Sequence, residues 1–305
     1  MTTDLSYDAE VIRSKDRIPP SLEKWISQFN LKEIFAPNIY TVTTWTKNCS
    51  PVAASEENRA IACMDILLWL FYLDDYEKHD YDSFFNQCLA ILDGRLPDDD
   101  MPQLFHAFYD VILRVASKGR SIEYFVKGRR QDIECYRWRN NLRQSKKTVT
   151  FDEYLSRRKT TIYITQWMDL WMILEDFCLL PDERNGGVIP VAAEMVISWH
   201  IFQNELVSVE RDKISGDPNL VLLYKCEKKC SLKEAIEHIE QLRDRAIVGF
   251  ANLYNSIRSK PTSVSQQCYK YLDLLNICLV GGVNNYGDNF RRYNTQILDA
   301  LLAME

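Results

Sequence analysis

Hydrophobic residues recur with helical spacing along almost the whole chain, and the alternation that predicts β-strands is nearly absent. The segments with this periodicity are residues 56–81, 103–118, 121–144, 151–179, 189–212, 231–256 and 262–281. Capping signals support the pattern, because Ser231 and Glu234 fit a capping box and Pro102 stands at an expected helix start. Apolar helix faces must pack against one another, so the sequence predicts an all-α bundle. No repeat or composition break divides it, and we expect a single domain over residues 1–305, with residues 1–20 as a flexible N-terminal arm.

Composition narrows the classes of protein that the chain can represent. Of its 305 residues 46% are hydrophobic and only 10 are Gly and 10 Pro, which excludes a disordered or linker-rich chain. A net charge of -6 gives no reason to expect nucleic acid or an anionic membrane as a partner. The longest apolar run, residues 66–73, is too short to span a bilayer, and residues 1–5 carry no signal pattern. We therefore expect a cytoplasmic protein without a membrane span.

Three polar residues stand four positions apart near the end of the segment 189–212, at Asn204, Ser208 and Asp212. A step of four residues moves a side chain only about 40° round a helix axis, so the three form a slanted stripe. An amide oxygen, a hydroxyl and a carboxylate make an all-oxygen ligand set that suits Mg²⁺ rather than zinc. The stripe therefore predicts a magnesium site, with a solvated polar helix face as the alternative.

A second group of carboxylates follows the apolar run. Asp74 and Asp75 close this run directly, and Glu77 and Asp80 come shortly after. Adjacent aspartates repel one another unless a divalent cation neutralises them. Carboxylates at the end of an apolar helix face are expected where an apolar cavity opens to water. The segment predicts a second metal-binding wall, with an exposed helix terminus as the alternative.

These motifs resemble those of a class I terpene synthase (terpene cyclase) of the compact microbial single-domain type. In that family an aspartate-rich helix faces a helix with the pattern Asn-x-x-x-Ser-x-x-x-Glu, and the two hold three Mg²⁺ against a substrate diphosphate. The match runs from Tyr40 to Tyr293 in the family's order. The resemblance implies a bundle of the class I terpenoid synthase type with a central apolar cavity. The implied metal ligands are Asp74, Asp75, Glu77, Asp80, Asn204, Ser208 and Asp212.

Further segments match the family on either side of the stripe. Arg158 lies in a segment that resembles the helix with the diphosphate-sensing arginine, and Thr161 and Ile162 would lie at the helix break that follows. Arg292 and Tyr293 resemble the family's terminal Arg-Tyr pair. The implied hydrogen-bond donors to the diphosphate are Arg158, Arg211, Arg292 and Tyr293, all but Arg211 being expected to be catalytic. We expect Arg158 and Arg292 to act on ionisation rather than on folding, and the region around them to be loose or hydrated until diphosphate and Mg²⁺ bind. A surface ion pair is the alternative for each arginine.

The aspartate motif departs from the family pattern, because Lys78 and His79 stand where its last carboxylate is usual. Either Glu77 or Asp80 would then complete the motif. Helix geometry favours Glu77, which lies about 60° from Asp74 round the axis, whereas Asp80 lies about 120° away. The sequence leaves both residues open as ligands.

The reaction of this family leaves a carbocation, which needs a dry wall of aromatic π-faces. Phe71 and Tyr286 are the aromatic residues that we expect to contact the substrate, and Tyr286 stands where the family often has Trp. Further candidates are Trp69, Trp199 and Phe202. Ordinary core packing is the alternative for each of these rings.

The resemblance implies a Mg²⁺-dependent cyclase that ionises a linear isoprenyl diphosphate and releases diphosphate. Farnesyl diphosphate, giving a sesquiterpene, is the expected substrate, and geranylgeranyl diphosphate, giving a diterpene, is the nearest alternative. Less favoured are a chain-elongating isoprenyl diphosphate synthase, which would carry a second aspartate-rich motif, and an inactive helical interaction protein. We expect three Mg²⁺ ions, with Mn²⁺ as a substitute, and leave monomer and homodimer open.

Overall fold

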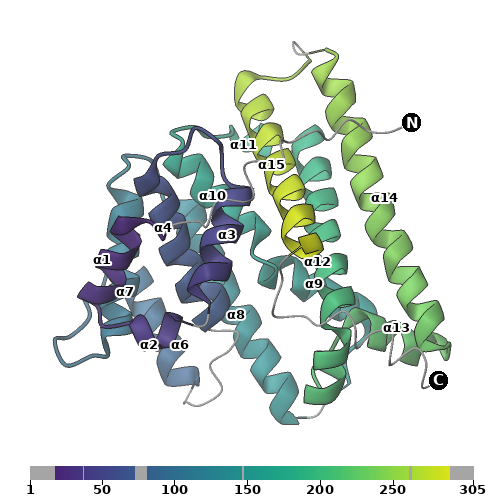
Figure 1. The fold of residues 1–305 in the computed structure, drawn as a ribbon, viewed down its shortest axis with the longest axis horizontal. Coiled ribbons are helices and arrows are strands. Elements are labelled where there is room, and N and C mark those ends of the chain that lie inside the picture. Colours follow the sequence, from purple (N-terminus) through teal and green to yellow (C-terminus); the bar gives the residue numbers. More distant parts are fainter. Residues whose placement is uncertain (1–17, 37, 73–80, 146–147, 261–262, 289–305) are drawn as a thin grey trace.

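A computed structural model describes residues 18–36, 38–72, 81–145, 148–260 and 263–288. The regular structure in this part of the chain is helical, which confirms the predicted fold class (Figure 1). The elements are α1 (Pro20–Gln28), α2 (Lys32–Phe35), α3 (Ile39–Cys49), α4 (Glu56–Ile66), η2 (Leu67–Tyr72), α6 (Tyr81–Leu92), α7 (Gln103–Ala116), α8 (Glu123–Ser145), α9 (Phe151–Thr161), α10 (Ile164–Leu174), α11 (Pro181–Asn185), α12 (Val188–Ser215), α13 (Leu220–Lys228), α14 (Leu232–Arg258) and α15 (Gln266–Asp288).

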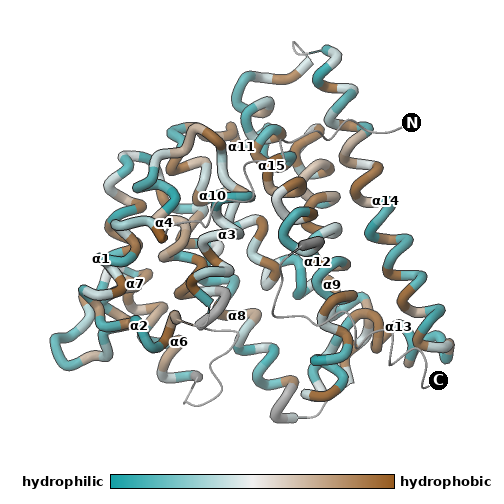
Figure 2. Tube along the Cα trace, viewed as in Figure 1, coloured by the Kyte–Doolittle hydropathy of each residue, from teal (hydrophilic) through white to brown (hydrophobic). Residues whose placement is uncertain are grey.

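The long helices α12 and α14 pack side by side, and α15 packs against both α12 and α3 (Figure 1). The α12–α14 pair is antiparallel, since Arg243 donates to Gln203 while Gly249, further along α14, lies beside Met195, further back on α12. Figure 2 shows hydrophilic and hydrophobic residues in alternation along α14, as expected for a helix with one face on the core. Helices α1, α4 and α7 form the opposite side of the molecule in Figure 1.

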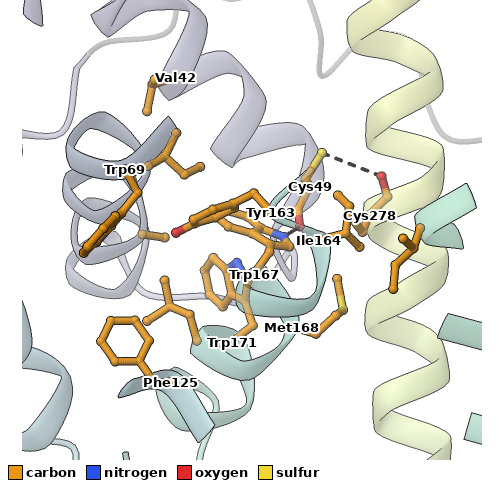
Figure 3. Close-up of a cluster of buried hydrophobic side chains, with 14 of the residues drawn as sticks. Val42, Cys49, Trp69, Phe125, Tyr163, Ile164, Trp167, Met168, Trp171 and Cys278 are labelled. Atoms are coloured by element: carbon orange, nitrogen blue, oxygen red, sulfur yellow. Dashed lines mark hydrogen bonds between the residues drawn. The ribbon is translucent and has the colours of Figure 1, made fainter. Parts of the chain in front are cut away.

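Helix α10 is the central element of the core. Its residues 166–174 are all buried, and it packs against α4, α7, α8, α12 and α15. The indoles of Trp167 and Trp171 meet edge to face with centroids 5.6 Å apart, and Trp167 Nε1 donates to the carbonyl of Cys49 on α3 at 3.1 Å. Figure 3 shows these rings inside a cluster formed with side chains of α3, α8 and α15. This central helix holds the two sides of the bundle together.

The prediction of one continuous helix over residues 151–179 is wrong in one respect, because the structure divides this segment into α9 and α10. Tyr163 lies between them with a φ of 73°, which is the left-handed conformation and cannot continue an α-helix. The break falls directly after Thr161 and Ile162, where the family resemblance placed it. The capping box of Ser231 and Glu234 is confirmed at the start of α14.

The expected helix over residues 56–81 begins as α4 and continues as the π-helix η2. A π-helix has i→i+5 hydrogen bonds and is rare, so hydrophobic periodicity alone did not predict it. Residues 73–80 lie outside the described part of the chain, and α6 follows from Tyr81. None of the described helices is long and apolar enough to cross a membrane.

Candidate active site

The predicted stripe on α12 lies where α12 meets α13, and two of its members are in direct contact. The hydroxyl of Ser208 donates to Asp212, with Oγ 2.6 Å from Oδ2. Asn219 Nδ2 donates to the same two atoms, at 3.2 Å to Ser208 Oγ and 3.0 Å to Asp212 Oδ2. All three side chains are buried. The oxygens of Ser208 and Asp212 therefore converge beside one amide group.

Asn219 is held there by the way that the chain turns from α12 into α13. Gly216 ends α12 in the left-handed conformation with a φ of 74°, and Asn219 then caps α13 by accepting from the Val221 N–H at 2.9 Å. Its Nδ2 also donates to the Glu205 carbonyl at 2.9 Å. Asn219 was not among the predicted site residues, although an Asn before an apolar run is a helix-start signal.

Arg158 reaches from α9 to the same part of α12. Its Nε donates to Glu205 Oε1 at 2.7 Å, and its Nη2 donates to Asn204 Oδ1 at 2.7 Å. Nη1 donates at 2.9 Å to Thr161 Oγ1, at the C-terminus of α9. The other oxygen of Glu205 accepts from the Leu220 N–H at 2.9 Å, so α9, α12 and α13 meet at one buried carboxylate.

The ion pair between Arg158 and Glu205 differs from the expectation of a loose, hydrated region, because it gives the arginine a buried carboxylate as its partner. Burial raises the pKa of the Glu205 carboxyl, whereas the nearby charge of Arg158 lowers it. Glu205 follows Asn204 in the sequence, so the stripe and this carboxylate are positioned together by one helical turn. A diphosphate that binds Arg158 must therefore either share the guanidinium with Glu205 or draw the guanidinium away from Glu205.

Arg211 lies on the exposed side of the stripe. Its Nε and Nη2 donate to Asp212 Oδ1 at 3.0 and 2.9 Å, and 44% of its side chain is exposed. Asp212 thus offers one oxygen to Ser208 and Asn219 and the other to Arg211. This pairing places Arg211 beside any ion that Asp212 binds.

An aromatic group borders the stripe at Asn204. The Asn204 Nδ2 donates to the Tyr286 hydroxyl at 3.3 Å. The ring of Tyr286 meets Trp45 and Trp199 edge to face, with centroids 5.9 and 6.1 Å apart. Helices α3, α12 and α15 thereby bring three aromatic rings to the polar stripe. Phe202, the other candidate ring on α12, is buried in the core.

His200, which was not among the predicted site residues, lies one helical turn before Asn204. The imidazole is buried between Trp45 and Trp199, with ring centroids 5.9 and 4.9 Å away. Burial lowers the pKa of His200 to about 3, so the ring is neutral at physiological pH. Gly282 on α15 makes room for it, because a Cβ added there would lie 2.5 Å from His200 Cε1.

Several predicted site residues lie outside the described part of the chain. They are Asp74, Asp75, Glu77, Asp80, Arg292 and Tyr293. The backbone of Phe71 belongs to η2, but its side chain is likewise outside the description. Their roles as ligands, donors and cavity wall stay predictions.

The chemistry of the stripe fits a divalent cation. Among the described residues, no three or more His, Cys, Asp and Glu side chains form a group that could hold a metal ion. The stripe instead combines one carboxylate with a hydroxyl and an amide oxygen, which are hard donors of the kind that Mg²⁺ prefers. Ser208 Oγ and Asp212 Oδ2 are close enough to share one ion, while Asn204 Oδ1 would have to exchange Arg158 for it.

Comparison with known proteins identifies relatives over most of the chain. The family model described as terpene synthase family 2, C-terminal metal binding, matches residues 65–247. A (+)-T-muurolol synthase from Roseiflexus castenholzii, named as cyclising (2E,6E)-farnesyl diphosphate, is 26% identical over 222 residues, covering 68% of this chain and 67% of the relative. A germacrene A synthase from Nostoc punctiforme is 21% identical over 257 residues, covering 77% and 76%.

Solved structures share the fold at low sequence identity. A linalool/nerolidol synthase from Streptomyces clavuligerus matches with a TM-score of 0.77 at 16% identity, covering 87% of this chain and 94% of that one. A germacradien-4-ol synthase from Streptomyces citricolor gives 0.74 at 17% identity, with coverages of 88% and 92%. The family model spans more than half of the chain and includes α9, the stripe on α12 and α13. The chain therefore belongs to terpene synthase family 2, and it is an enzyme with terpene cyclase activity.

Proposed function

We propose that this terpene synthase is a Mg²⁺-dependent cyclase that converts farnesyl diphosphate into a sesquiterpene and diphosphate. The main support is the convergence of Ser208 and Asp212 oxygens on the helix face that also carries Asn204, the partner of Arg158. Hard oxygen donors beside an arginine fork suit a diphosphate complexed with metal. The substrate length is supported by the Roseiflexus relative, whose name specifies farnesyl diphosphate.

In the proposed reaction the allylic C–O bond breaks heterolytically, and its electron pair leaves with the diphosphate oxygen. Divalent cations supply positive charge that neutralises this leaving group. Arg158 donates hydrogen bonds to the diphosphate and gives up its bond to Asn204, whose oxygen then becomes available as a ligand. Tyr286 and Trp199 offer π-electrons to the carbocation, and loss of a proton or capture of water ends the reaction.

The remaining parts of the proposed site come from the resemblance. Asp74 and Asp75, completed by Glu77 or Asp80, would hold metal together with the stripe, and three ions would be bound in all. The additional hydrogen-bond donors to the diphosphate are Arg211, Arg292 and Tyr293, and Phe71 joins Tyr286 at the hydrocarbon. Mn²⁺ substitutes for Mg²⁺ because it accepts similar oxygen ligands.

The test is incubation of the purified protein with geranyl, farnesyl or geranylgeranyl diphosphate, each with Mg²⁺, Mn²⁺ or EDTA. Gas chromatography–mass spectrometry should find a cyclic C15 product from farnesyl diphosphate with metal, and none with EDTA. Ser208→Ala should lose most of this product, whereas Ser198→Ala, a matched change earlier on α12, should retain it. Cyclic product from the C20 substrate alone would instead assign a diterpene cyclase. Product only with added isopentenyl diphosphate would indicate chain elongation, and no product from any substrate would refute the proposal.

A further inference from the structure

A buried charged cluster centres on Arg129 of α8, outside the site described above. The guanidinium is fully buried, with Nη2 2.6 Å from Asp65 Oδ2 and Nη1 2.9 Å from Asp132 Oδ2. The rings that surround its Cζ are Trp69, Phe125 and Tyr163, with centroids 5.2, 4.9 and 4.7 Å away. These ring faces compensate part of the cost of burying the cation.

Tyr163 connects this cluster to the break between α9 and α10. Its hydroxyl donates a short hydrogen bond to Asp65 and accepts one from Arg129 Nη2 at 2.8 Å. Its left-handed backbone is sparsely populated by aromatic residues, so the surrounding contacts must hold it. Figure 3 shows the Tyr163 ring inside the core, in the cluster that also contains Trp69 and Phe125. The Tyr163 hydroxyl thus anchors the break between α9 and α10 to Asp65 and Arg129.

The same break is attached to Arg158. The Arg158 Nη1 donates to Thr161 Oγ1 at the end of α9. Gln166, in the first turn of α10, donates from Nε2 to the Thr160 carbonyl at 3.2 Å and to Asp132 Oδ1 at 2.5 Å. A shift of Arg158 from Asn204 towards a diphosphate therefore acts on a helix end whose next anchors belong to the Arg129 cluster.

On its other side the cluster holds the α4–η2 helix. Asp65 is in the last turn of α4 and Trp69 is in η2, so Arg129 contacts both sides of the transition from α- to π-helix. Single π-helical turns within helices are frequent at functional sites. In the sequence, Asp74 follows two residues after the end of η2.

We propose that Asp65, Arg129 and Tyr163 form a positioning cluster that couples diphosphate binding at Arg158 to the orientation of α4–η2. The proposal rests on the proposed role of Arg158 as a diphosphate donor. Fold stability alone does not explain the cluster, because apolar side chains of similar volume often stabilise a fold as much as a buried ion pair does. Within the described structure, its members even leave Asp65 Oδ1 and Arg129 Nε buried without a hydrogen-bond partner. These are positioning residues, since they contact one another and the helix ends.

The test compares Tyr163→Phe with Tyr254→Phe, the same change at a matched tyrosine elsewhere in the fold. Tyr254 also donates to an aspartate, Asp273 at 2.6 Å, and accepts from an arginine, Arg258 at 3.2 Å. It lies in the last turns of α14, at the opposite end from α13 and Asn219. Tyr254→Phe therefore removes the same kind of hydroxyl without touching the break.

Two readouts are measured on the full chain: the rise in melting temperature caused by Mg²⁺ plus pyrophosphate, and steady-state kinetics with farnesyl diphosphate. Tyr163→Phe should lose at least half of the ligand-induced rise, and its kcat should fall about tenfold while KM stays within about threefold. Tyr254→Phe should lower the melting temperature of the free protein but keep the ligand-induced rise and kcat. Asp65→Asn, which weakens the same contact, takes the place of Tyr163→Phe if that variant does not fold.

The coupling is overturned if the variants at Tyr163 and Tyr254 behave alike while the wild type binds and turns over substrate. A wild-type protein with neither a ligand-induced rise nor product would overturn the proposed function itself, and this proposal with it. The two failures are therefore distinguishable by the wild-type measurements alone.

Discussion

Arg158 and Glu205 form a hydrogen-bonded ion pair between α9 and α12, with Nε 2.7 Å from Oε1, and only 1% of the Glu205 side chain is exposed. The proposed diphosphate donor thus already has a buried counter-ion within the fold. Glu205 is in turn held by the Leu220 N–H, so the pair also connects α12 with the start of α13. Arg158 consequently has a structural role as well as a proposed role in the reaction.

Arg158→Ala should destabilise the ligand-free protein, because it leaves Glu205 buried without its counter-ion. We expect the free energy of unfolding to fall by about 3 kcal/mol, a typical value for breaking a buried pair. Glu205→Gln in the same chain removes the uncompensated charge, so the double variant should recover part of this loss. Urea denaturation without Mg²⁺ or pyrophosphate measures the unfolding free energies of the wild type, Arg158→Ala and the double variant. If Arg158→Ala is as stable as the wild type, the pair contributes nothing to the stability of the fold.

Asp212→Asn should abolish turnover while preserving the fold. Asn keeps the shape of Asp212 and can still accept from Ser208 and Asn219, but it lacks the negative charge that the proposed cation site requires. We expect product formation to fall at least about 100-fold, the size of effect seen when one stabiliser of transition-state charge is removed. Asp217→Asn, just beyond the end of α12, is the control and should remain active. Equal activity of the two variants would remove Asp212 from the site.

Gly282→Ala should destabilise the protein through overpacking between α15 and α12. The added Cβ would lie 2.5 Å from His200 Cε1 and 2.9 Å from Trp199 Cζ3, and both rings are buried. We expect a loss of about 1–3 kcal/mol of unfolding free energy. Gly249→Ala is the control, because its Cβ meets only the flexible Met195 at 3.3 Å and Ala favours a helix interior. In thermal unfolding, the melting temperature should fall clearly for Gly282→Ala and should fall much less, or rise, for Gly249→Ala.

The long helices and the stripe could be predicted from the sequence because both depend on local geometry. The spacing of Asn204, Ser208 and Asp212 fixes their common face wherever α12 lies, and the Ser231 capping box marks a helix start within four residues. Hydrophobic periodicity could not place the break at Tyr163. Its left-handed backbone is imposed by contacts that arise only in the folded core.

The buried charges could not be predicted for the same physical reason. Arg129 bonds to Asp65 and Tyr163, which are 64 and 34 residues away in the sequence, and no local pattern connects such partners. Glu205 was recognisable as a residue next to the stripe, but its pairing with Arg158 depends on how α9 packs against α12. Long-range packing, rather than residue type, decides which charged side chain meets which.

Asp132 makes stability depend on pH in a defined direction. Burial raises the pKa of its carboxyl to about 7, against an ordinary value of 3.8, although Arg129 opposes this shift. Between pH 4 and pH 7 the folded protein holds a proton at Asp132 that the unfolded chain releases. The stabilisation from this group is therefore complete below pH 4 and is lost as the pH rises through about 7.

Asp132→Asn should remove this dependence, because the amide is neutral at every pH and Gln166 can turn its unpartnered Oε1 towards the new NH₂ group. The difference in unfolding free energy, wild type minus variant, should fall by up to about 1.4 kcal/mol per pH unit between pH 4 and pH 7. Urea denaturation at pH 5, 6, 7 and 8 measures it, with Asp99→Asn in the exposed loop before α7 as the control. A difference that stays constant over this range, or rises with pH, would show that Asp132 is ionised throughout in the folded protein.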